Sequence, residues 1–125
     1  MDFELTDEQR LWKDTIIDFC RNELVYDLND LEERDEFPWD AWRKCAEMQL
    51  LALPFVEEFG GCEADFLTTV LTLQYLGYGC KDAGLVHAIA TQILCGLQIQ
   101  LFGSEEIKKK YLPSLCSGEK VFAQA

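Results

Sequence analysis

The chain has 125 residues, 49% of them hydrophobic, which fits one folded domain with its own core and excludes a disordered chain. Its formal net charge is −12, and 19 of its 23 acidic residues lie in residues 1–65. So acidic a surface repels nucleic acid and anionic membranes, so we expect neither as a partner.

The first predicted element is a helix over residues 7–24. Thr6 and Gln9 have the spacing of a capping box, which marks a helix start. Apolar residues then recur at helical spacing: Trp12, Ile16, Phe19 and Leu24. An acidic stretch over residues 27–36 shows no regular pattern, so we expect it to connect two helices.

A second helix is predicted over residues 38–48, because Pro38 suits the first turn of a helix. Residues 53–63 contain Pro54 and the pair Gly60 and Gly61, and we expect an irregular turn there. A third helix is predicted to begin near Phe66 and to end near residues 77–79.

Residues 83–102 form a run of 20 residues without a charge, which is long enough to cross a membrane. The run also contains His87, Thr91 and three glutamines, and it lacks flanking basic or aromatic belts. We therefore expect the buried central helix of a soluble, cytoplasmic domain, with a membrane span as the alternative.

The last helix is predicted to begin after Gly103, with Ser104 as its cap, and to reach Pro113. Val121 to Ala125 then indicate the opening of a β-strand. The predicted fold class is all-α, an antiparallel bundle of four to six helices that ends in the start of a strand. We expect residues 1–120 to form the helical domain and residues 121–125 to begin another.

Few residues in this sequence could carry catalysis by themselves. The six cysteines are spread singly without a CxxC pair, so we expect reduced thiols, with a disulfide scaffold as the alternative. His87 is the only histidine, and it lies within an apolar helix. We therefore predict no catalytic residue and no metal site in this chain.

Four segments along the chain are "FELTDEQRLWKDTIIDFCRNEL", "RDEFPWDAWRKCAEMQLLAL", "PFVEEFGGCEAD" and "FGSEEIKKKYLPSLCSGEK". Their order and spacing resemble the N-terminal helical domain of the flavin-dependent acyl-CoA dehydrogenases. That domain has a Leu-Thr-x-Glu-Gln opening, a Phe-Pro-x-x-x-Trp segment, a Pro-Glu-Glu-Tyr-Gly-Gly turn and a Phe-Gly-Thr/Ser-Glu-Glu stretch. The resemblance covers nearly the whole chain.

The resemblance implies the first of three domains, followed by a middle β-domain and a C-terminal helical domain. FAD and the thioester substrate are held where the three domains meet, and the catalytic glutamate belongs to the C-terminal domain. It thus implies α,β-dehydrogenation of an acyl-CoA or acyl-carrier-protein thioester by the complete enzyme, commonly a homo-oligomer. We expect the isolated chain to hold little or no FAD and to be inactive.

The resemblance also implies candidate site residues. The helix over residues 83–102 contributes to the acyl-binding pocket, which places His87, Ala90, Thr91 and Leu94 as substrate-binding residues. The alternative is that these four only pack against neighbouring helices. Gln124 is expected to be the first side chain near FAD.

The chain departs from the family pattern at three positions. Val56 replaces a usual proline, Gln49 a common glycine and Gln74 a frequent glutamate. These departures leave the thioester carrier open. Two other functions also remain open, a non-catalytic helical binding or scaffolding module and a four-helix bundle unrelated to acyl chemistry.

Overall fold

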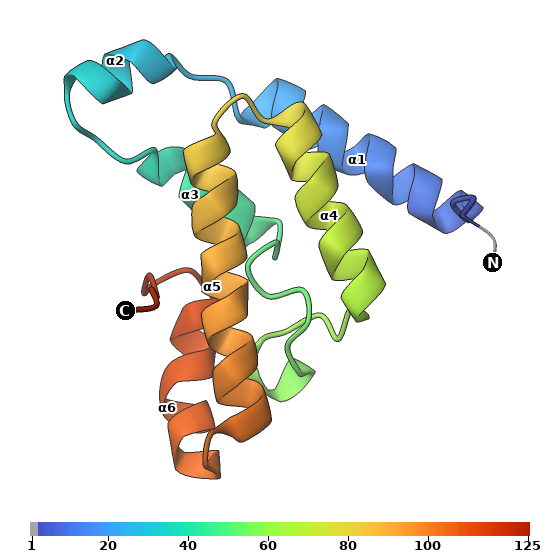
Figure 1. Cartoon of the computed structure of the whole chain (residues 1–125), viewed down its shortest axis with the longest axis vertical. Coiled ribbons are helices and arrows are strands. Elements are labelled where there is room, and N and C mark those ends of the chain that lie inside the picture. The colour runs from blue at the N-terminus through green and yellow to red at the C-terminus, as the bar shows by residue number, and fades with distance from the viewer. Residues whose placement is uncertain (1–2) are drawn as a thin grey trace.

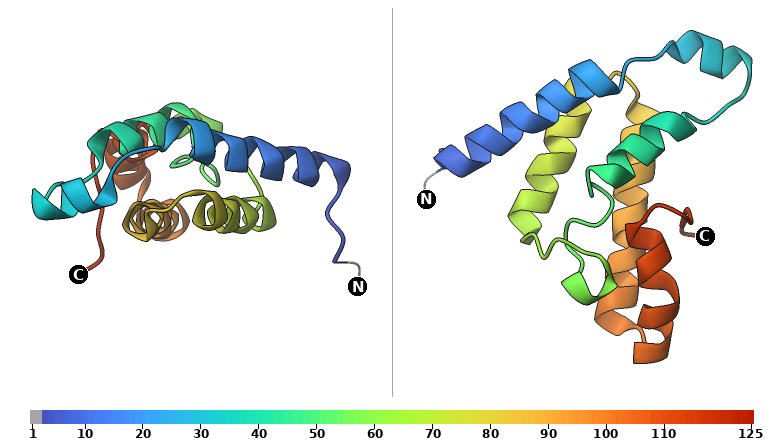
Figure 2. Two further views of the ribbon diagram at one scale, coloured as in Figure 1. Left: turned by 90° about the horizontal axis from the view of Figure 1, so that it is seen from above. Right: turned by 180° about the vertical axis from the view of Figure 1, so that it is seen from behind.

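The computed structural model describes residues 3–125, and within this range the fold is all-α (Figure 1). Two layers of helices are visible in Figure 2, with α4 and α5 forming one layer and α1 and α3 lying in the other. The elements are α1 (Asp7–Glu23), α2 (Leu28–Glu33), α3 (Trp39–Glu47), the 3-10 turn η1 (Glu57–Phe59), α4 (Phe66–Gly79), α5 (Ala83–Phe102) and α6 (Glu105–Cys116). The predicted fold class of four to six helices is confirmed.

Helix α1 begins with the predicted capping box. The Gln9 amide N–H donates to Thr6 Oγ1 at 3.2 Å, and the Thr6 amide N–H donates to Gln9 Oε1 at 2.9 Å. Its apolar side packs on α4, where Trp12 Nε1 donates to Thr72 Oγ1 at 2.7 Å. This contact satisfies the only polar atom of a large aromatic side chain, so the ring can pack at the interface.

Helix α2 is a short element that the sequence analysis did not predict. The side chain of Asp27 accepts from the backbone N–H groups of Asn29 and Asp30 at 3.0 and 3.3 Å, which begins the helix. Helix α2 has six residues and buries none of them, so it is too short to show a helical period of apolar residues. An aspartate cap three residues ahead of a second acidic residue was its only sequence signal.

The segment between α3 and α4 carries a second small core against α5 and α6. Phe55 and Phe59 are buried here with Leu112, Leu115 and Cys116 of α6. The ring of Phe55 lies directly against the backbone of Gly96 on α5, where a Cβ atom would overlap it. Gly60 has φ +92°, so the predicted glycine turn uses a left-handed conformation that favours glycine.

The predicted β-strand over residues 121–125 is wrong within the described residues, because these residues form no strand. The backbone N–H of Phe122 instead donates to the side chain of Gln92 at 2.8 Å, and the Phe122 ring packs edge-on against Tyr111. A strand needs a neighbouring strand to take its hydrogen bonds, and none lies in residues 3–125. The predicted domain boundary at residue 120 stays a prediction.

We predict that Gly96→Ala destabilises the chain by about 1–3 kcal/mol, because the added methyl group overlaps Phe55 in a closely packed core. Gly77→Ala is the matched control, since Gly77 is exposed in α4 and a Cβ there has nothing within 4 Å. That control is expected to gain up to about 1 kcal/mol from helix propensity. Urea unfolding of the three chains measures both effects, and equal stabilities for the two variants would contradict the packing argument.

Candidate functional site on α5 and the C-terminal segment

The four predicted substrate-binding residues lie together on one side of α5. His87, Thr91 and Leu94 follow one another at spacings of four and three residues, and Ala90 lies between them. His87 and Leu94 are exposed, and Ala90 and Thr91 are half-buried. The buried residues of α5 are Leu85, Ile89, Gln92, Ile93, Cys95 and Gly96. The predicted central helix is therefore buried along one side and open along the other.

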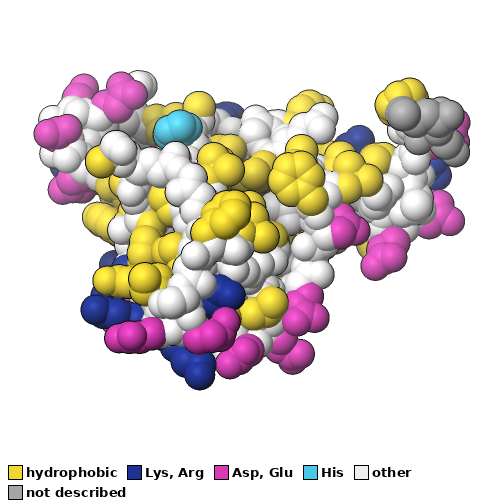
Figure 3. All heavy atoms as spheres, turned by 60° about the horizontal axis from the view of Figure 1, so that its bottom comes forward, with side chains coloured by type: hydrophobic (Ala, Val, Ile, Leu, Met, Phe, Trp, Pro, Cys, Tyr) yellow, Lys and Arg dark blue, Asp and Glu magenta, His cyan; other side chains and the backbone are white. Residues whose placement is uncertain are grey.

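The open side of α5 continues into an exposed apolar surface on α4, here called the α4/α5 face. Figure 3 shows hydrophobic side chains gathered across this part of the molecule. Its members are Phe66, Leu67 and Val70 of α4 with Leu94, Leu101 and Phe102 of α5. Phe66 is 73% exposed and Phe102 is 84% exposed. Exposed apolar residues gathered in this way mark surfaces that contact a ligand or another protein.

Gln124, the predicted cofactor-binding residue, lies beside the C-terminal half of α5. It lines a groove of about 730 Å³ together with Cys95, Gln98 and Phe102 of α5 and Phe122 of its own segment. Gln98 lies one helical turn beyond Leu94, so the groove adjoins the side of α5 that carries the four predicted residues. Sequence reasoning missed Gln98 and Phe102, although the same helical spacing reaches both positions.

The groove beside Gln124 has mixed character. Its apolar wall includes Ile99, Phe102 and Ile107, and its exposed amides are those of Gln98 and Gln124. Amide groups can donate and accept hydrogen bonds, as the polar edge of a flavin ring requires. The residues present thus fit one edge of a flavin, without the phosphate-binding groups that hold the rest of FAD.

By length and composition α5 could cross a membrane, and it is the one helix of residues 3–125 that passes this test. Core helices of other proteins pass the same test. Here the exposed side of α5 carries His87 and Gln98, both polar. Polar groups on a lipid-facing side would be costly, so the structure gives the membrane alternative no added support.

Several thiols in the core have perturbed pKa values. Burial raises the pKa of the Cys45 thiol to about 12, and it raises the pKa values of Cys20 and Cys116 to about 11. Such thiols are poor nucleophiles at neutral pH. All six cysteines are free, and Cys62 is the exposed one. Within residues 3–125 no group of three or more His, Cys, Asp and Glu side chains could hold a metal ion.

Comparison with known proteins gives one family match that spans nearly the whole chain. Residues 6–119 match the family described as acyl-CoA dehydrogenase, N-terminal domain. A curated relative is the short-chain specific acyl-CoA dehydrogenase of Clostridium acetobutylicum, which is 33% identical over 123 residues. The alignment covers 98% of this chain and 32% of that relative, so the chain spans about a third of its length.

Two solved structures share the fold closely. The prolyl acyl carrier protein oxidase AnaB superposes with a TM-score of 0.89 at 39% identity, covering 94% of this chain and 32% of that one. The FAD complex of PigA superposes with a TM-score of 0.86 at 30% identity, covering 97% of this chain and 32% of that one. Relatives of this chain thus bind FAD as complete enzymes.

We predict that the stability of the chain falls as the pH rises above about 9. The folded state keeps the protons of Cys20, Cys45 and Cys116 until about pH 11 to 12, whereas the unfolded state releases them near the ordinary thiol value of 9.0. Because the unfolded state then binds fewer protons, the contribution is fully present below this value and is lost toward the folded-state values. Urea midpoints between about pH 8 and pH 11 measure it.

The matched pair for this measurement is Cys45→Ala and Cys62→Ala. Cys45 is fully buried and Cys62 is exposed, so the first substitution is expected to flatten the loss of stability with pH more than the second. Equal pH profiles for the two variants would show that the buried thiols do not cause the loss.

Proposed function

The chain belongs to the family of acyl-CoA dehydrogenase N-terminal domains, and from this we propose that it is the N-terminal helical domain of a flavin-dependent enzyme. That enzyme would dehydrogenate an acyl thioester between its α and β carbons. The observation that carries the proposal is that the open side of α5 adjoins the groove lined by Gln124. The free cysteines support a reducing, cytoplasmic location as part of the proposal.

The role that we propose for α5 is to form one wall of the acyl pocket. Ala90 and Leu94 would contact the acyl chain and exclude water, and Thr91 would present a hydroxyl group near the thioester end. FAD, when bound, supplies the acceptor for the hydride, and Gln124 would lie against one edge of it. No residue of this chain is assigned as the base that removes the α-proton, since the family resemblance places that glutamate in another domain.

The remaining domains are the proposed partners of the α4/α5 face. The chain spans about a third of its relatives, so about two thirds of a relative's length has no counterpart here. A neighbouring domain on this face would cover Phe66, Val70 and Leu101, each of which is now exposed. Burying these side chains is favourable by roughly 25 cal/mol for each Å² of apolar surface. Homo-oligomer formation by the complete enzyme is part of the same proposal.

Two kinds of thioester remain candidates for the substrate. The Clostridium relative carries acyl-CoA dehydrogenase in its name, and AnaB carries prolyl acyl carrier protein. The chain is 39% identical to AnaB and 33% identical to the Clostridium relative. For this reason we keep a carrier-protein thioester as the second candidate beside a CoA thioester. Turnover with butyryl-CoA and with a prolyl-loaded carrier protein separates the two candidates.

The first test of the proposal is flavin binding. We predict that the isolated chain binds little FAD, and that the chain joined to or co-expressed with the β-domain and C-terminal helical domain of its enzyme carries flavin absorbance. Complete domains without flavin would favour the non-catalytic helical module. Dehydrogenation by the isolated 125-residue chain would contradict the proposed division of roles.

We predict that Leu94→Ala in the complete enzyme lowers kcat/KM for a longer acyl thioester by about 10-fold, because it removes apolar contacts from the pocket wall. Steady-state kinetics with short and long acyl thioesters measures the change, and the short substrate is expected to lose less. Leu11→Ala is the matched control, since Leu11 is 70% exposed on α1, away from α5. Equal losses in both variants would remove Leu94 from the pocket.

A further inference from the structure

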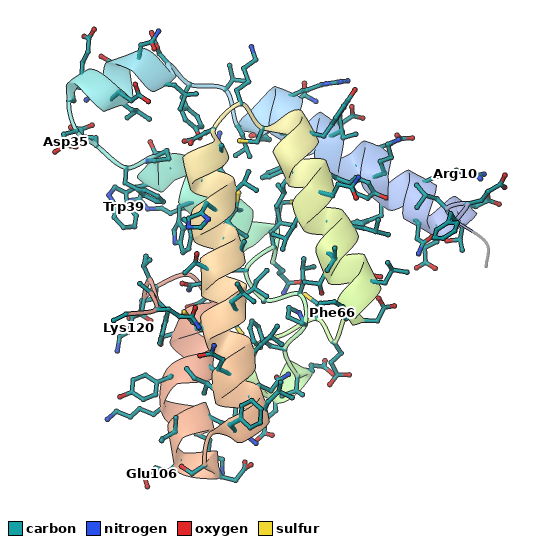
Figure 4. All side chains as sticks on the ribbon, viewed as in Figure 1. Arg10, Asp35, Trp39, Phe66, Glu106 and Lys120 are labelled. Atoms are coloured by element: carbon teal, nitrogen blue, oxygen red, sulfur yellow. The ribbon has the colours of Figure 1, made fainter. Side chains whose placement is uncertain are left out.

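Gln92 is a fully buried amide within an otherwise apolar helix. Its Nε2 donates to the carbonyl oxygens of Leu115 at 3.0 Å and Lys120 at 2.8 Å. Its Oε1 accepts from the backbone N–H of Phe122 at 2.8 Å. Figure 4 shows Lys120 beside the middle of α5. One side chain therefore joins α5 to the end of α6 and to two points of the C-terminal segment.

A second contact fixes the same segment from the opposite layer. Trp42 Nε1 donates to the carbonyl oxygen of Gly118 at 3.0 Å, and Gly118 has φ +73°. A Cβ atom at Gly118 would lie 2.8 Å from Leu51 Cδ1 and 2.9 Å from Ala46 Cβ. The chain thus leaves α6 along a path held at residues 118, 120 and 122. Gln92 is the side chain that hydrogen-bonds to both of the last two, while the Lys120 N–H also donates to the Ser114 carbonyl at 3.2 Å and the Phe122 ring packs on Tyr111.

We infer that Gln92 is a positioning residue, which fixes where Gln124 lies relative to the substrate side of α5. We call the three hydrogen bonds of Gln92 the clamp. Thr91 precedes Gln92 and Leu94 lies within the same helical turn, so the proposed acyl wall and the clamp belong to one rigid piece of helix. Gln124 follows Phe122 by two residues, roughly 7 Å of extended chain. The part of the inference that concerns what Gln124 approaches rests on the proposed function. The hydrogen bonds of Gln92 to the C-terminal segment do not depend on it.

The test compares two isosteric substitutions on the same helix. Gln92→Met keeps the length of the side chain and removes its three hydrogen bonds. Gln100→Met is the matched control, because Gln100 Oε1 accepts from Val56 N–H at 3.0 Å and its Nε2 donates to the Pro54 carbonyl at 3.3 Å. Both variants lose side-chain amide contacts to backbone, and only the first loses contacts to residues 120–122.

Hydrogen exchange of the Phe122 amide in the 125-residue chain is the direct measurement. We expect Gln92→Met to lower its protection at least about 10-fold beyond any change in global stability, and Gln100→Met to leave it at the global value. Equal changes in both variants, or none in the first, would overturn the clamp. If Gln92→Met fails to fold, Gln92→Asn keeps an amide in the core but ends about 1.5 Å short of the segment, and the same selective loss is expected.

A measurement on the complete enzyme separates a positioning role from a purely structural one. With the other domains present, Gln92→Met is expected to slow flavin reduction in a single turnover by about 10-fold, with the Kd for the thioester changed less than 3-fold. Gln100→Met is expected to leave both unchanged. An unaltered reduction rate in Gln92→Met would overturn the positioning role, whereas a wild-type enzyme without flavin would overturn the proposed function and leave the exchange result standing.

Discussion

The arrangement of the C-terminal half depends on one buried amide. Gln92 makes its three hydrogen bonds inside an apolar core, where a polar group without partners would cost about 1–3 kcal/mol. The cost of leaving these bonds unmade favours a single path for the chain beyond α6, because Gln92 is the side chain that bonds to the end of α6, to Lys120 and to Phe122 together. Apolar packing alone would allow α6 and its exit to slide along α5, since dispersion and burial are not directional.

Helix α5 has more apolar residues than the described part of the chain buries. Six of its residues are buried, while Leu94, Leu101 and Phe102 are exposed beside the exposed residues of α4. A helix that is apolar around most of its circumference is normally covered on all sides. Within residues 3–125, no element covers the exposed side of α5. The solved relatives are about three times as long as this chain. Their additional length, about twice that of this chain, is available to cover such a face.

The sequence predicted the long elements well, because local chemistry determines them. The capping box of Thr6 and the Ser104 cap of α6 each satisfy backbone groups within a few residues. The uncharged run of α5 is likewise visible in one continuous stretch of sequence. Helix α2 escaped because it buries nothing, and the strand at Val121 was wrongly predicted because strand pairing is a long-range interaction. The four α5 residues fell on one side because periodicity alone places them, whereas the approach of Gln124 to Gln98 comes from tertiary packing.

The glutamines of α5 show how few polar groups organise an apolar helix. In sequence they served only to argue against a membrane span, yet in the fold two of the three bind separate backbone segments. Gln92 holds the C-terminal segment, Gln100 holds the segment before η1, and Gln98 is left exposed in the groove beside Gln124. Two of them bind backbone groups of the segments packed against α5, so their positions are constrained by the fold. The side chain of Gln98 is not constrained in this way. Of the three glutamines, it is therefore the one whose identity a ligand in the groove could determine.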